Sequence, residues 1–399
     1  MFNPSPYKIP IVDLRAQYAS IRDHVRSAID AVAETQQFIL GPTVKQFETE
    51  MAAFLGCQHA VGVASGSDAL LLALMALGIG PGDAVITTPF TFFSTVSSIT
   101  RLGATPLFVD IDSDSYLLSV VKLQEFLHER GTTRQGETVD AETGAHIKAL
   151  LPVHLFGQVC AMDSLARVAK VYHLEIVEDV AQACGARLNI AGNEKFAGTI
   201  GALGCFSFFP SKNLGGFGDG GLVSAHSPDL ADRIKMLRMH GESTKYHHDI
   251  TGLNSRLDSL QAAVLSVKLK YLENWCEARI ARATTYWQLF IGSGLVGQQV
   301  LAIPPRPTDK SHVFNNYCIR AESRDQLKQF LADVGIQSEI YYPLPLHLQK
   351  CFAGIGYMQG DFPHAEMAAS QVLALPLYPE LTREQQESVV AAIVKFYRR

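Results

Sequence analysis

The sequence predicts an α/β protein in which a large domain with a mainly parallel central sheet flanked by helices is followed by a smaller C-terminal α/β domain. The chain has 399 residues, which exceeds the size of one average domain. From about residue 60, apolar runs typical of buried strands alternate with helical patterns. From about residue 228 the period becomes helical, and a second α/β pattern begins after about residue 300. We expect the domains to be residues 1–255 and 256–399.

The elements of the large domain follow in order along the chain. Residues 14–55 look mostly helical, with a break at the Gly41-Pro42 pair. Strands of the central sheet are expected at residues 60–65, 84–89, 105–112, 147–155, 174–180 and 202–209, each of which is an apolar run. Helices are expected between them at residues 67–78, 90–103 and 162–173.

The C-terminal part begins with a polar loop, residues 242–256, followed by one long helix over residues 256–290. The smaller domain is expected to contain strands at 315–321 and 336–343, with a helix at 324–335 between them. An amphipathic helix at 383–398 closes the chain.

The composition argues against several classes of protein. Lysine and arginine total 34 against 39 acidic residues, a formal net charge of -5 with no long block of either sign. A nucleic-acid binder would more often carry a basic stripe. The longest apolar runs fall short of the ~20 residues of a membrane span, and the N-terminus lacks the pattern of a secretory signal. We therefore expect a cytoplasmic protein that binds neither nucleic acid nor membrane.

Metal and disulfide sites are not expected either. The seven cysteines are scattered and none has CxxC spacing, which argues against a zinc site or a disulfide framework. The run His247-His248-Asp249 could suggest metal binding, but adjacent side chains in a loop diverge and no third ligand has suitable spacing. We interpret this run as loop surface or as a contact of the substrate.

Candidate functional residues are sought where strands end, because parallel α/β sheets bind ligands at the carboxyl ends of their strands. The first strand is followed by Ser65-Gly66-Ser67-Asp68 at the start of a helix. Small residues at a helix N-terminus can bind a phosphate, although the same pattern also makes an ordinary helix cap. The run lacks the GxGxxG pattern of a dinucleotide-binding dehydrogenase.

Two further strand ends carry residues of interest. Phe90 follows the strand 84–89 and could stack on a flat ligand or simply fill the core. Asp179 lies at the end of the strand 174–180, with Glu178 and Gln182 beside it. Such a carboxylate could be a metal ligand, a catalytic acid, a partner of a protonated ring nitrogen or a helix cap.

Lys212 lies in the stretch SFFPSKNLGGFGDGG, residues 207–221. The glycines follow the lysine, whereas a P-loop places them before it. Burial among Phe206, Phe208 and Phe209 would lower the pKa of the amine and favour its neutral, nucleophilic form, which forms Schiff bases. Together these features suit pyridoxal 5'-phosphate (PLP). They are an anion site at the helix start, an aromatic ring that can stack, a carboxylate that can pair with a ring nitrogen, and a lysine that can form a Schiff base.

The chain resembles the DegT/StrS family of PLP-dependent nucleotide-sugar aminotransferases, which have the aspartate-aminotransferase fold (fold type I). The likeness runs nearly from end to end. Its blocks are FILGPTVKQFE, ASGSDALLLAL, TPFTF, VDID, PVHLFGQ, VEDVAQACGA, FSFFPSKNLGGFGDGG, LRMHG and GLNSRLDSLQAAVL. The resemblance implies that the large domain binds PLP.

The resemblance also implies roles for individual residues. Lys212 would bind PLP covalently and later act as general acid and base, Asp179 would pair with the pyridinium nitrogen, and Phe90 would stack on the ring. Other implied cofactor contacts are Gly66, Ser67, Gln182, Ser207 and Asn254. Asn254 would reach the cofactor phosphate of a neighbouring subunit, which implies a homodimer with shared active sites. Implied substrate contacts are Arg256, Tyr341, Tyr342 and His347.

The activity implied by the resemblance is transamination of a nucleotide-linked keto-hexose, with L-glutamate as donor and pyridoxamine phosphate between the two half-reactions. Gln182 stands where many 4-aminotransferases have histidine, and residues 254–258, NSRLD, resemble enzymes acting on 3-keto sugars. We therefore favour C3 of a UDP-linked 2-acetamido sugar for lipopolysaccharide or related polysaccharides.

Three alternatives stay open at this point. Two are a dTDP-3-keto-6-deoxyhexose and a 4-keto-6-deoxyhexose as substrate, and the third is a non-catalytic PLP-binding regulator. Tyr341 stands where some relatives that act on uronic acids have histidine, so the presence of a substrate carboxylate is also open.

Overall fold

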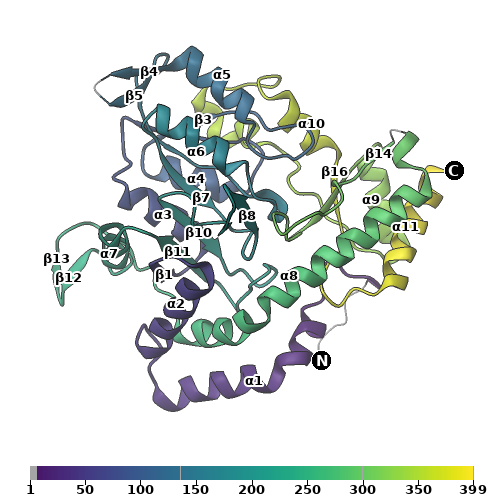
Figure 1. Ribbon diagram of the computed structural model, residues 1–399, viewed down its shortest axis with the longest axis horizontal. Coiled ribbons are helices and arrows are strands. Elements are labelled where there is room, and N and C mark those ends of the chain that lie inside the picture. Colours follow the sequence, from purple (N-terminus) through teal and green to yellow (C-terminus); the bar gives the residue numbers. More distant parts are fainter. Residues whose placement is uncertain (1–6, 135, 299, 399) are drawn as a thin grey trace.

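The computed structural model describes residues 7–134, 136–298 and 300–398. Helices surround a mixed, mostly parallel central sheet (Figure 1), which confirms the predicted α/β class. The helices are α1 (Leu14–Thr35), α2 (Pro42–Leu55), α3 (Gly66–Ala76), α4 (Phe93–Arg101), α5 (Val120–Arg130), α6 (Met162–Val171), α7 (Pro228–Leu237), α8 (Ser259–Ser293), α9 (Arg324–Asp333), α10 (Pro363–Gln371) and α11 (Arg383–Tyr397).

Within the described residues, the central sheet has nine strands. Its main path runs β1 (His59–Val63), β11 (Gly221–Ala225), β10 (Leu203–Ser207), β7 (Glu175–Asp179), β6 (His146–Leu150), β2 (Asp83–Thr87) and β3 (Thr105–Phe108). The pairs from β10 to β3 are parallel, whereas β11 is antiparallel to both β1 and β10. The hairpin of β4 (Gly131–Arg134) and β5 (Glu137–Asp140) extends from β6. As a result β1, β10, β7, β6 and β2 all point their carboxyl ends toward one edge.

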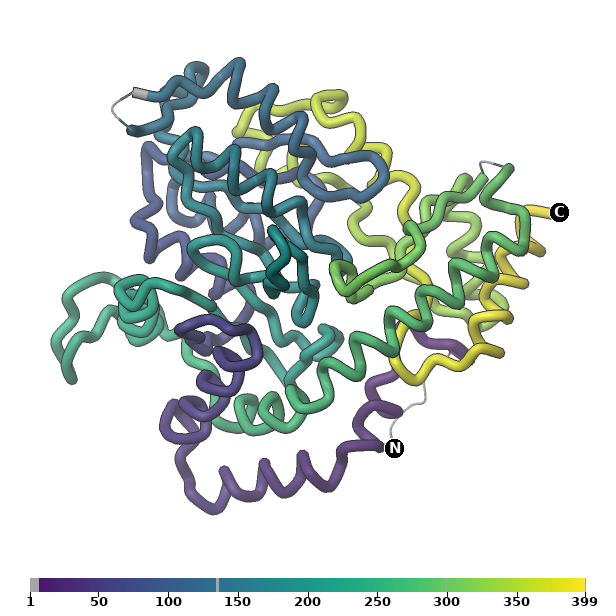
Figure 2. Tube along the Cα trace, in the orientation of Figure 1, coloured from purple at the N-terminus to yellow at the C-terminus, as the bar shows by residue number. Residues whose placement is uncertain are grey.

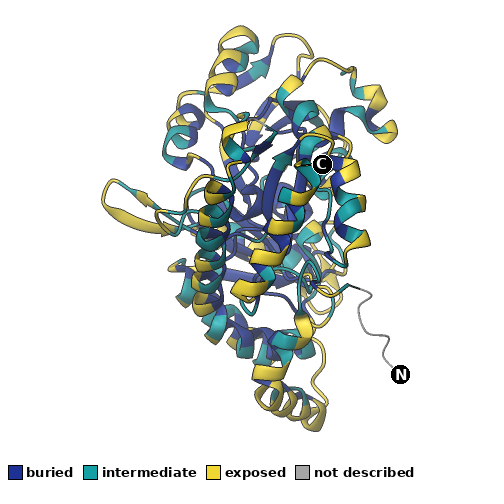
Figure 3. Ribbon diagram, turned by 90° about the vertical axis from the view of Figure 1, so that its right-hand side faces the viewer, coloured by how far each residue is buried: buried dark blue, intermediate teal, exposed yellow. Residues whose placement is uncertain are grey.

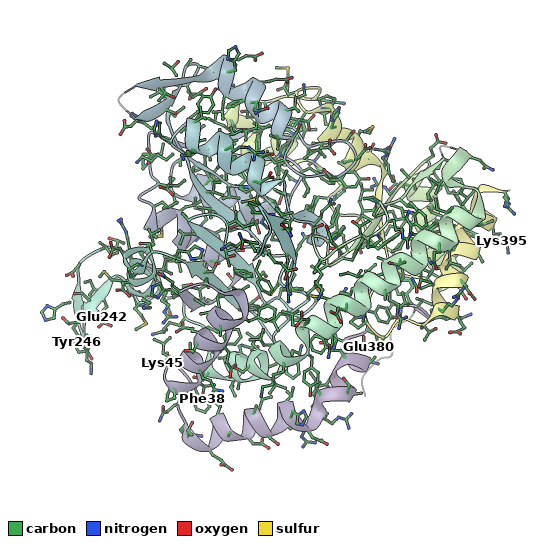
Figure 4. All side chains as sticks on the ribbon, in the orientation of Figure 1. Phe38, Lys45, Glu242, Tyr246, Glu380 and Lys395 are labelled. Atoms are coloured by element: carbon green, nitrogen blue, oxygen red, sulfur yellow. The ribbon has the colours of Figure 1, made fainter. Side chains whose placement is uncertain are left out.

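The part of the chain that the structure describes also forms three smaller sheets. They are β8 (Arg187–Ile190) with β9 (Asn193–Phe196), β12 (Glu242–Thr244) with β13 (His247–His248), and β14 (Leu301–Ala302) with β15 (Tyr317–Ala321) and β16 (Val372–Leu375). The β12–β13 hairpin projects from the body of the molecule (Figure 2). Glu242 begins this hairpin, and Tyr246, in the turn between its strands, lies farther from the body (Figure 4).

Local signals explain where several elements begin. The carboxylate of Asp13 accepts hydrogen bonds from the backbone N–H groups of Arg15 and Ala16 and so caps α1. Pro42 opens α2, as expected for a residue that needs no N–H partner at that position. Thr382 and Gln385 form a reciprocal capping box at the start of α11.

The apolar residues form two large clusters. The first lies around the central sheet, in the dark blue interior of Figure 3. Strands β2 and β11 are buried along their whole length. The second is formed mainly by residues after Ala283, together with Ile9 from the N-terminal segment. Several residues between Leu346 and Ala374 nevertheless belong to the first cluster, although Leu373 belongs to the second. The division of the chain at residue 255 therefore stays a prediction.

Helix α8 connects these two clusters. It has 35 residues and contacts α1, α2 and α11 (Figure 1). Its buried residues recur every three or four positions, which matches the helical period and places them on one face. The residues of this face include Leu265, Lys268, Leu272, Cys276, Arg279, Ala283, Tyr286 and Phe290.

Most expected elements are present, with shifted ends. The long helix begins at Ser259 and not at residue 256. The prediction of a strand at residues 336–343 is wrong. This segment forms only isolated β-bridges, at Ile336 and at Glu339. The place beside β15 is taken instead by β16, which sequence analysis missed. Within the described residues, no helix is both long and apolar enough to cross a membrane.

Candidate active site

The predicted site residues gather at the carboxyl edge of the central sheet. Asp179 ends β7, and Ser207 ends the neighbouring parallel strand β10. Gly66 and Ser67 begin α3, directly after β1. Lys212 follows β10 by five residues. Because these strands run in the same direction, residues that are far apart in the sequence meet at one edge.

Asp179 is 4% exposed and accepts two hydrogen bonds. The hydroxyl of Thr95 donates to Oδ2 at 2.9 Å, and the N–H of Ala181 donates to Oδ1 at 3.1 Å. Burial raises the pKa of Asp179, and these two donors together with the charge of Lys212 oppose that shift. Thr91 lies 3.0 Å from Thr95 and must be the donor there, because the Thr95 hydroxyl proton is already used.

Lys212 lies in the turn that follows β10, where its N–H donates to the carbonyl of Phe209 at 2.9 Å. The side chain keeps some exposed surface, yet burial lowers the pKa of its amine to about 8, and the nearby charge of Asp179 opposes this shift. A substantial fraction of the amine is therefore neutral near pH 8, which is the nucleophilic form.

A small polar cradle lies beside this lysine. Gly66 packs so closely on Ser207 that a Cβ at position 66 would lie 2.5 Å from the Ser207 Cβ. The hydroxyls of Ser67 and Ser94 are 2.5 Å apart, and the Ser65 hydroxyl caps α3 by accepting the Asp68 N–H. Free N–H groups at the start of α3 and these hydroxyls make this corner suited to an anion.

Aromatic side chains form one wall of the site. Phe90 is fully buried, and its ring centroid lies 6.2 Å from that of Tyr342 and 6.4 Å from that of Phe156. Gln182 connects the same residues, since its Nε2 donates to the Tyr342 hydroxyl at 2.9 Å and its Oε1 accepts the Phe156 N–H at 2.7 Å. Phe92, which sequence analysis did not single out, is more than half exposed and packs on Tyr342.

The remaining predicted substrate contacts lie in different surroundings. The ring of Tyr341 is half-buried and 5.9 Å from that of Tyr342. The imidazole of His347 is buried, with its Nε2 3.1 Å from Glu366 and its ring packed against Phe362. A sugar contact for His347 stays a prediction, and its Nδ1 has no hydrogen-bond partner among the described residues.

Asn254 and Arg256 lie in the segment that leads into α8. Asn254 is exposed, and its backbone pairs with that of Met239. Between them, Ser255 is buried, and its hydroxyl accepts the N–H of Ala64 at 3.3 Å. This bond places the segment next to the residue that precedes the polar cradle. The proposed reach of Asn254 into a second subunit stays a prediction.

A buried pair supports the strand end that carries Asp179. The Nδ1 of His154 accepts the N–H of Cys160, so the ring proton must be on Nε2, which lies 3.0 Å from Glu178. Glu178 also accepts the N–H groups of Gly198, Ile200 and Gly201. The backbone of His154 donates to the carbonyl of Asp179 at 3.0 Å.

The run His247-His248-Asp249 lies in the projecting β12–β13 hairpin and is exposed. In the parts of the chain that the structure describes, no group of three or more histidine, cysteine, aspartate or glutamate side chains could hold a metal ion.

Comparison with known proteins identifies relatives of the whole chain. The model of the DegT/DnrJ/EryC1/StrS aminotransferase family matches residues 19–394. A "Pleiotropic regulatory protein" of Geobacillus stearothermophilus is 43% identical, with 98% of this chain and 99% of that protein covered. A UDP-N-acetyl-3-dehydro-alpha-D-glucosamine 3-aminotransferase of Acidithiobacillus ferrooxidans is 40% identical, with 97% of each covered. A dTDP-3-amino-3,4,6-trideoxy-alpha-D-glucose transaminase of Streptomyces venezuelae is 40% identical, with 98% and 97% covered.

Solved structures share the fold. DesV of S. venezuelae, solved in complex with a ketimine intermediate, has a TM-score of 0.88 and 40% identity, covering 98% of this chain and 99% of that one. NtdA of Bacillus subtilis, solved with bound cofactor PMP, has a TM-score of 0.83 and 26% identity, covering 96% and 83%. Proteins of the same fold were thus solved with PMP in one case and with a ketimine intermediate in the other.

Proposed function

Because the chain belongs to the DegT/DnrJ/EryC1/StrS aminotransferase family, we propose that it transfers an amino group from L-glutamate to C3 of a UDP-linked 2-acetamido-3-keto-hexose. Family membership makes the protein a PLP-dependent aminotransferase of nucleotide sugars. The donor, the nucleotide and the carbon that receives the amine are the proposed parts.

The observation that supports the cofactor chemistry behind the proposal is the meeting of Lys212 and Asp179 at one sheet edge. The pKa of Lys212 is lowered to about 8, and Asp179 is a buried carboxylate that accepts only two hydrogen bonds from the described residues. A ring N–H would give this carboxylate a third donor, and the cradle of Gly66, Ser67 and Ser207 would take the phosphate. The residues of the site fit PLP.

When bound, PLP supplies a conjugated ring that takes up electrons from the α-carbon of the donor and carries the amino group as pyridoxamine phosphate. Lys212 would hold the cofactor through its amine in the resting enzyme. Once displaced by glutamate, the free Nζ of Lys212 would accept the proton from the glutamate Cα. Its pKa near 8 suits an amine that must both accept and return a proton around neutral pH.

Asp179 would keep the ring nitrogen protonated, since an ionised carboxylate within hydrogen-bond reach stabilises the charged form. Thr95 and Ala181 orient this carboxylate. The aromatic wall around Phe90 would cover the ring, while Gln182 and Tyr342 are linked to each other beside it. The proposed contacts of the sugar nucleotide are Arg256, Tyr341, Tyr342 and His347.

Two relatives support a 3-keto sugar. The A. ferrooxidans relative is named as a 3-aminotransferase of a UDP-linked sugar. A Pseudomonas aeruginosa relative, 34% identical over 96% of this chain and 99% of its own length, is named UDP-2-acetamido-2-deoxy-3-oxo-D-glucuronate aminotransferase. The S. venezuelae relative supports the second candidate, a dTDP-linked 3-keto-6-deoxyhexose.

The experiment that tests the proposal is incubation with L-glutamate and a panel of UDP- and dTDP-linked 3-keto and 4-keto sugars, with products identified by mass spectrometry and NMR. We expect an amine at C3 of the UDP-2-acetamido sugar, and no product from a Lys212→Ala variant. Preferential turnover of the dTDP sugar would favour the second candidate. Amination at C4 of any sugar would contradict the proposal.

The relative named as a regulatory protein suggests a direct check on catalysis. Addition of L-glutamate alone should change the visible absorbance of the bound cofactor and release 2-oxoglutarate. A cofactor-loaded protein that gives neither signal with any amino donor would be a binding protein and not the proposed enzyme.

A further inference from the structure

Two side chains of α8 form hydrogen bonds with the backbone of the glycine-rich loop that follows Lys212. Lys268 Nζ donates to the carbonyl of Gly215 at 2.6 Å. Gln261 Oε1 accepts the N–H of Phe217 at 2.7 Å. Gln261 and Lys268 are seven residues apart, about two helical turns, so they lie on the same side of α8.

The loop folds back on the segment that contains Lys212. The N–H of Gly216 donates to the carbonyl of Phe208 at 2.7 Å, and the N–H of Phe208 donates to Gly220. A Cβ at Gly215 would clash with the carbonyl oxygen of Pro210, which explains why the loop needs glycine at that place. Lys212 therefore sits in a closed turn whose outer side is fixed by α8.

Lys268 is a buried cation whose ammonium contacts the carbonyl of Gly215 and the ring of Phe217. It is 3% exposed, and its Nζ lies 5.1 Å from the centroid of the Phe217 ring. Burial lowers its pKa to about 8. In the part of the chain that the structure describes, it forms no ion pair with a carboxylate. A buried amine is costly unless its hydrogen bonds are satisfied, and here they are directed to the loop.

We propose that Lys268 is a positioning residue that acts through Gly215 to hold the lysine-bearing turn in place, with Gln261 as the second point of attachment. The proposal rests on the proposed covalent role of Lys212. Loss of the Lys268 ammonium leaves the Gly215 carbonyl unpaired, so the loop and the Lys212 amine lose their fixed position relative to Asp179.

The first measurement is hydrogen exchange in the loop of the cofactor-loaded protein. In Lys268→Met and in Gln261→Ala, the backbone amides of residues 215–217 should exchange about tenfold faster than in the natural protein, while those of β7 stay unchanged. Lys270→Met is the matched control, because Lys270 is exposed on the same helix, and exchange in this variant should match the natural protein.

The second measurement separates positioning from folding. The rate of the absorbance change with glutamate should fall about tenfold in Lys268→Met, with the Km for the sugar substrate unchanged. If Lys268→Met does not fold, Gln261→Ala carries the same test, since Gln261 is only half-buried. The double variant, Lys268→Met with Gln261→Ala, should react with glutamate only slightly more slowly than the slower of the two single variants. Both changes remove attachments of the same loop, so their effects are not additive.

Either of two results would overturn the proposal: unchanged loop exchange in both folded variants, or unchanged rates despite faster exchange. These outcomes differ from failure of the proposed function. Borohydride reduction should fix the cofactor permanently on Lys212 of the natural protein. If no reduced cofactor is found on Lys212, the proposed function fails, whatever the Lys268 variants show.

Discussion

The Thr95 hydroxyl donates a 2.9 Å hydrogen bond to Oδ2 of Asp179, joining the first turn of α4 to the end of β7 across 84 positions of sequence. Both side chains are buried. Thr91, four residues before Thr95 and outside α4, donates in turn to the Thr95 hydroxyl. The carboxylate is thus oriented by a relay that begins beside Phe90.

Replacement of Thr95 by valine should remove this donor while keeping the shape of the side chain. A hydrogen bond to a charged group contributes about 1.5–3 kcal/mol, so we expect kcat to fall at least tenfold. The pKa of Asp179, already raised by burial, should rise further. The acidic limb of the pH–kcat profile should therefore move to higher pH.

Thr100→Val is the control for this change, because Thr100 lies in the same helix and its hydroxyl donates to the carbonyl of Ser97. Its profile should match that of the natural protein. An acidic limb that stays in place in Thr95→Val would show that Thr95 does not tune the carboxylate.

Gly66→Ala should weaken cofactor binding. The added Cβ would lie 2.5 Å from the Ser207 Cβ, so one of the two segments of the cradle must move. We expect the dissociation constant for PLP, measured by fluorescence titration, to rise about tenfold or more. Gly80→Ala is the matched control, since nothing lies within 4 Å of a Cβ there. Equal affinity in both variants would contradict the close packing of the cradle.

Lys212→Met should change how the stability of the cofactor-free protein depends on pH. The folded-state pKa of Lys212 is about 8, below its ordinary value of 10.5, so the unfolded chain binds more protons between these values. The natural protein should therefore gain stability relative to the variant as pH rises from 8 to 10.5. The full shift corresponds to about 3 kcal/mol, and partial exposure of the side chain reduces this to roughly 2 kcal/mol.

Urea unfolding at several pH values measures this difference. A Lys270→Met variant should follow the natural protein at every pH, because Lys270 is exposed. Parallel pH curves for Lys212→Met and the natural protein would mean that the amine is not desolvated.

Mixing of two inactive variants tests whether active sites are shared between subunits. If Asn254 completes the site of a partner, a mixed dimer of Lys212→Ala and Asn254→Ala subunits contains one site in which both residues are intact. Random exchange at equal amounts should then restore about a quarter of the natural activity. No recovery after verified exchange, or full activity of a verified monomer, would argue that each site is made by one chain.

Much of the central sheet could be predicted because its strands are short apolar runs that give the same signal in any context. The ends of strands also located Asp179 and Phe90, whereas Ser207 was implied only by the family resemblance. The strand β11 was missed, since Gly221–Ala225 follows a glycine cluster that is typical of a loop. It becomes a strand because it fits between β1 and β10.

The supporting residues of the site could not be predicted from local patterns. Lys268 reaches Gly215 across 53 positions, and a lysine in an amphipathic helix is ordinarily interpreted as surface. Thr95 has the same difficulty, because only the packing of α4 against the sheet shows that its hydroxyl meets Asp179. Tertiary contacts of this kind leave no periodic signal in the sequence.

The length of α8 has a consequence for how this protein can change over time. Lys268 and Tyr286 are 18 positions apart, which is about five complete turns and about 27 Å, so both face the interior. Lys268 holds the loop of the lysine, and Tyr286 lies in the second apolar cluster. Deletion of one residue between them would rotate one end by about 100° relative to the other. The helix thus fixes the distance and the relative rotation between the loop after Lys212 and the second apolar cluster. We therefore expect insertions and deletions in α8 to be tolerated less well than substitutions.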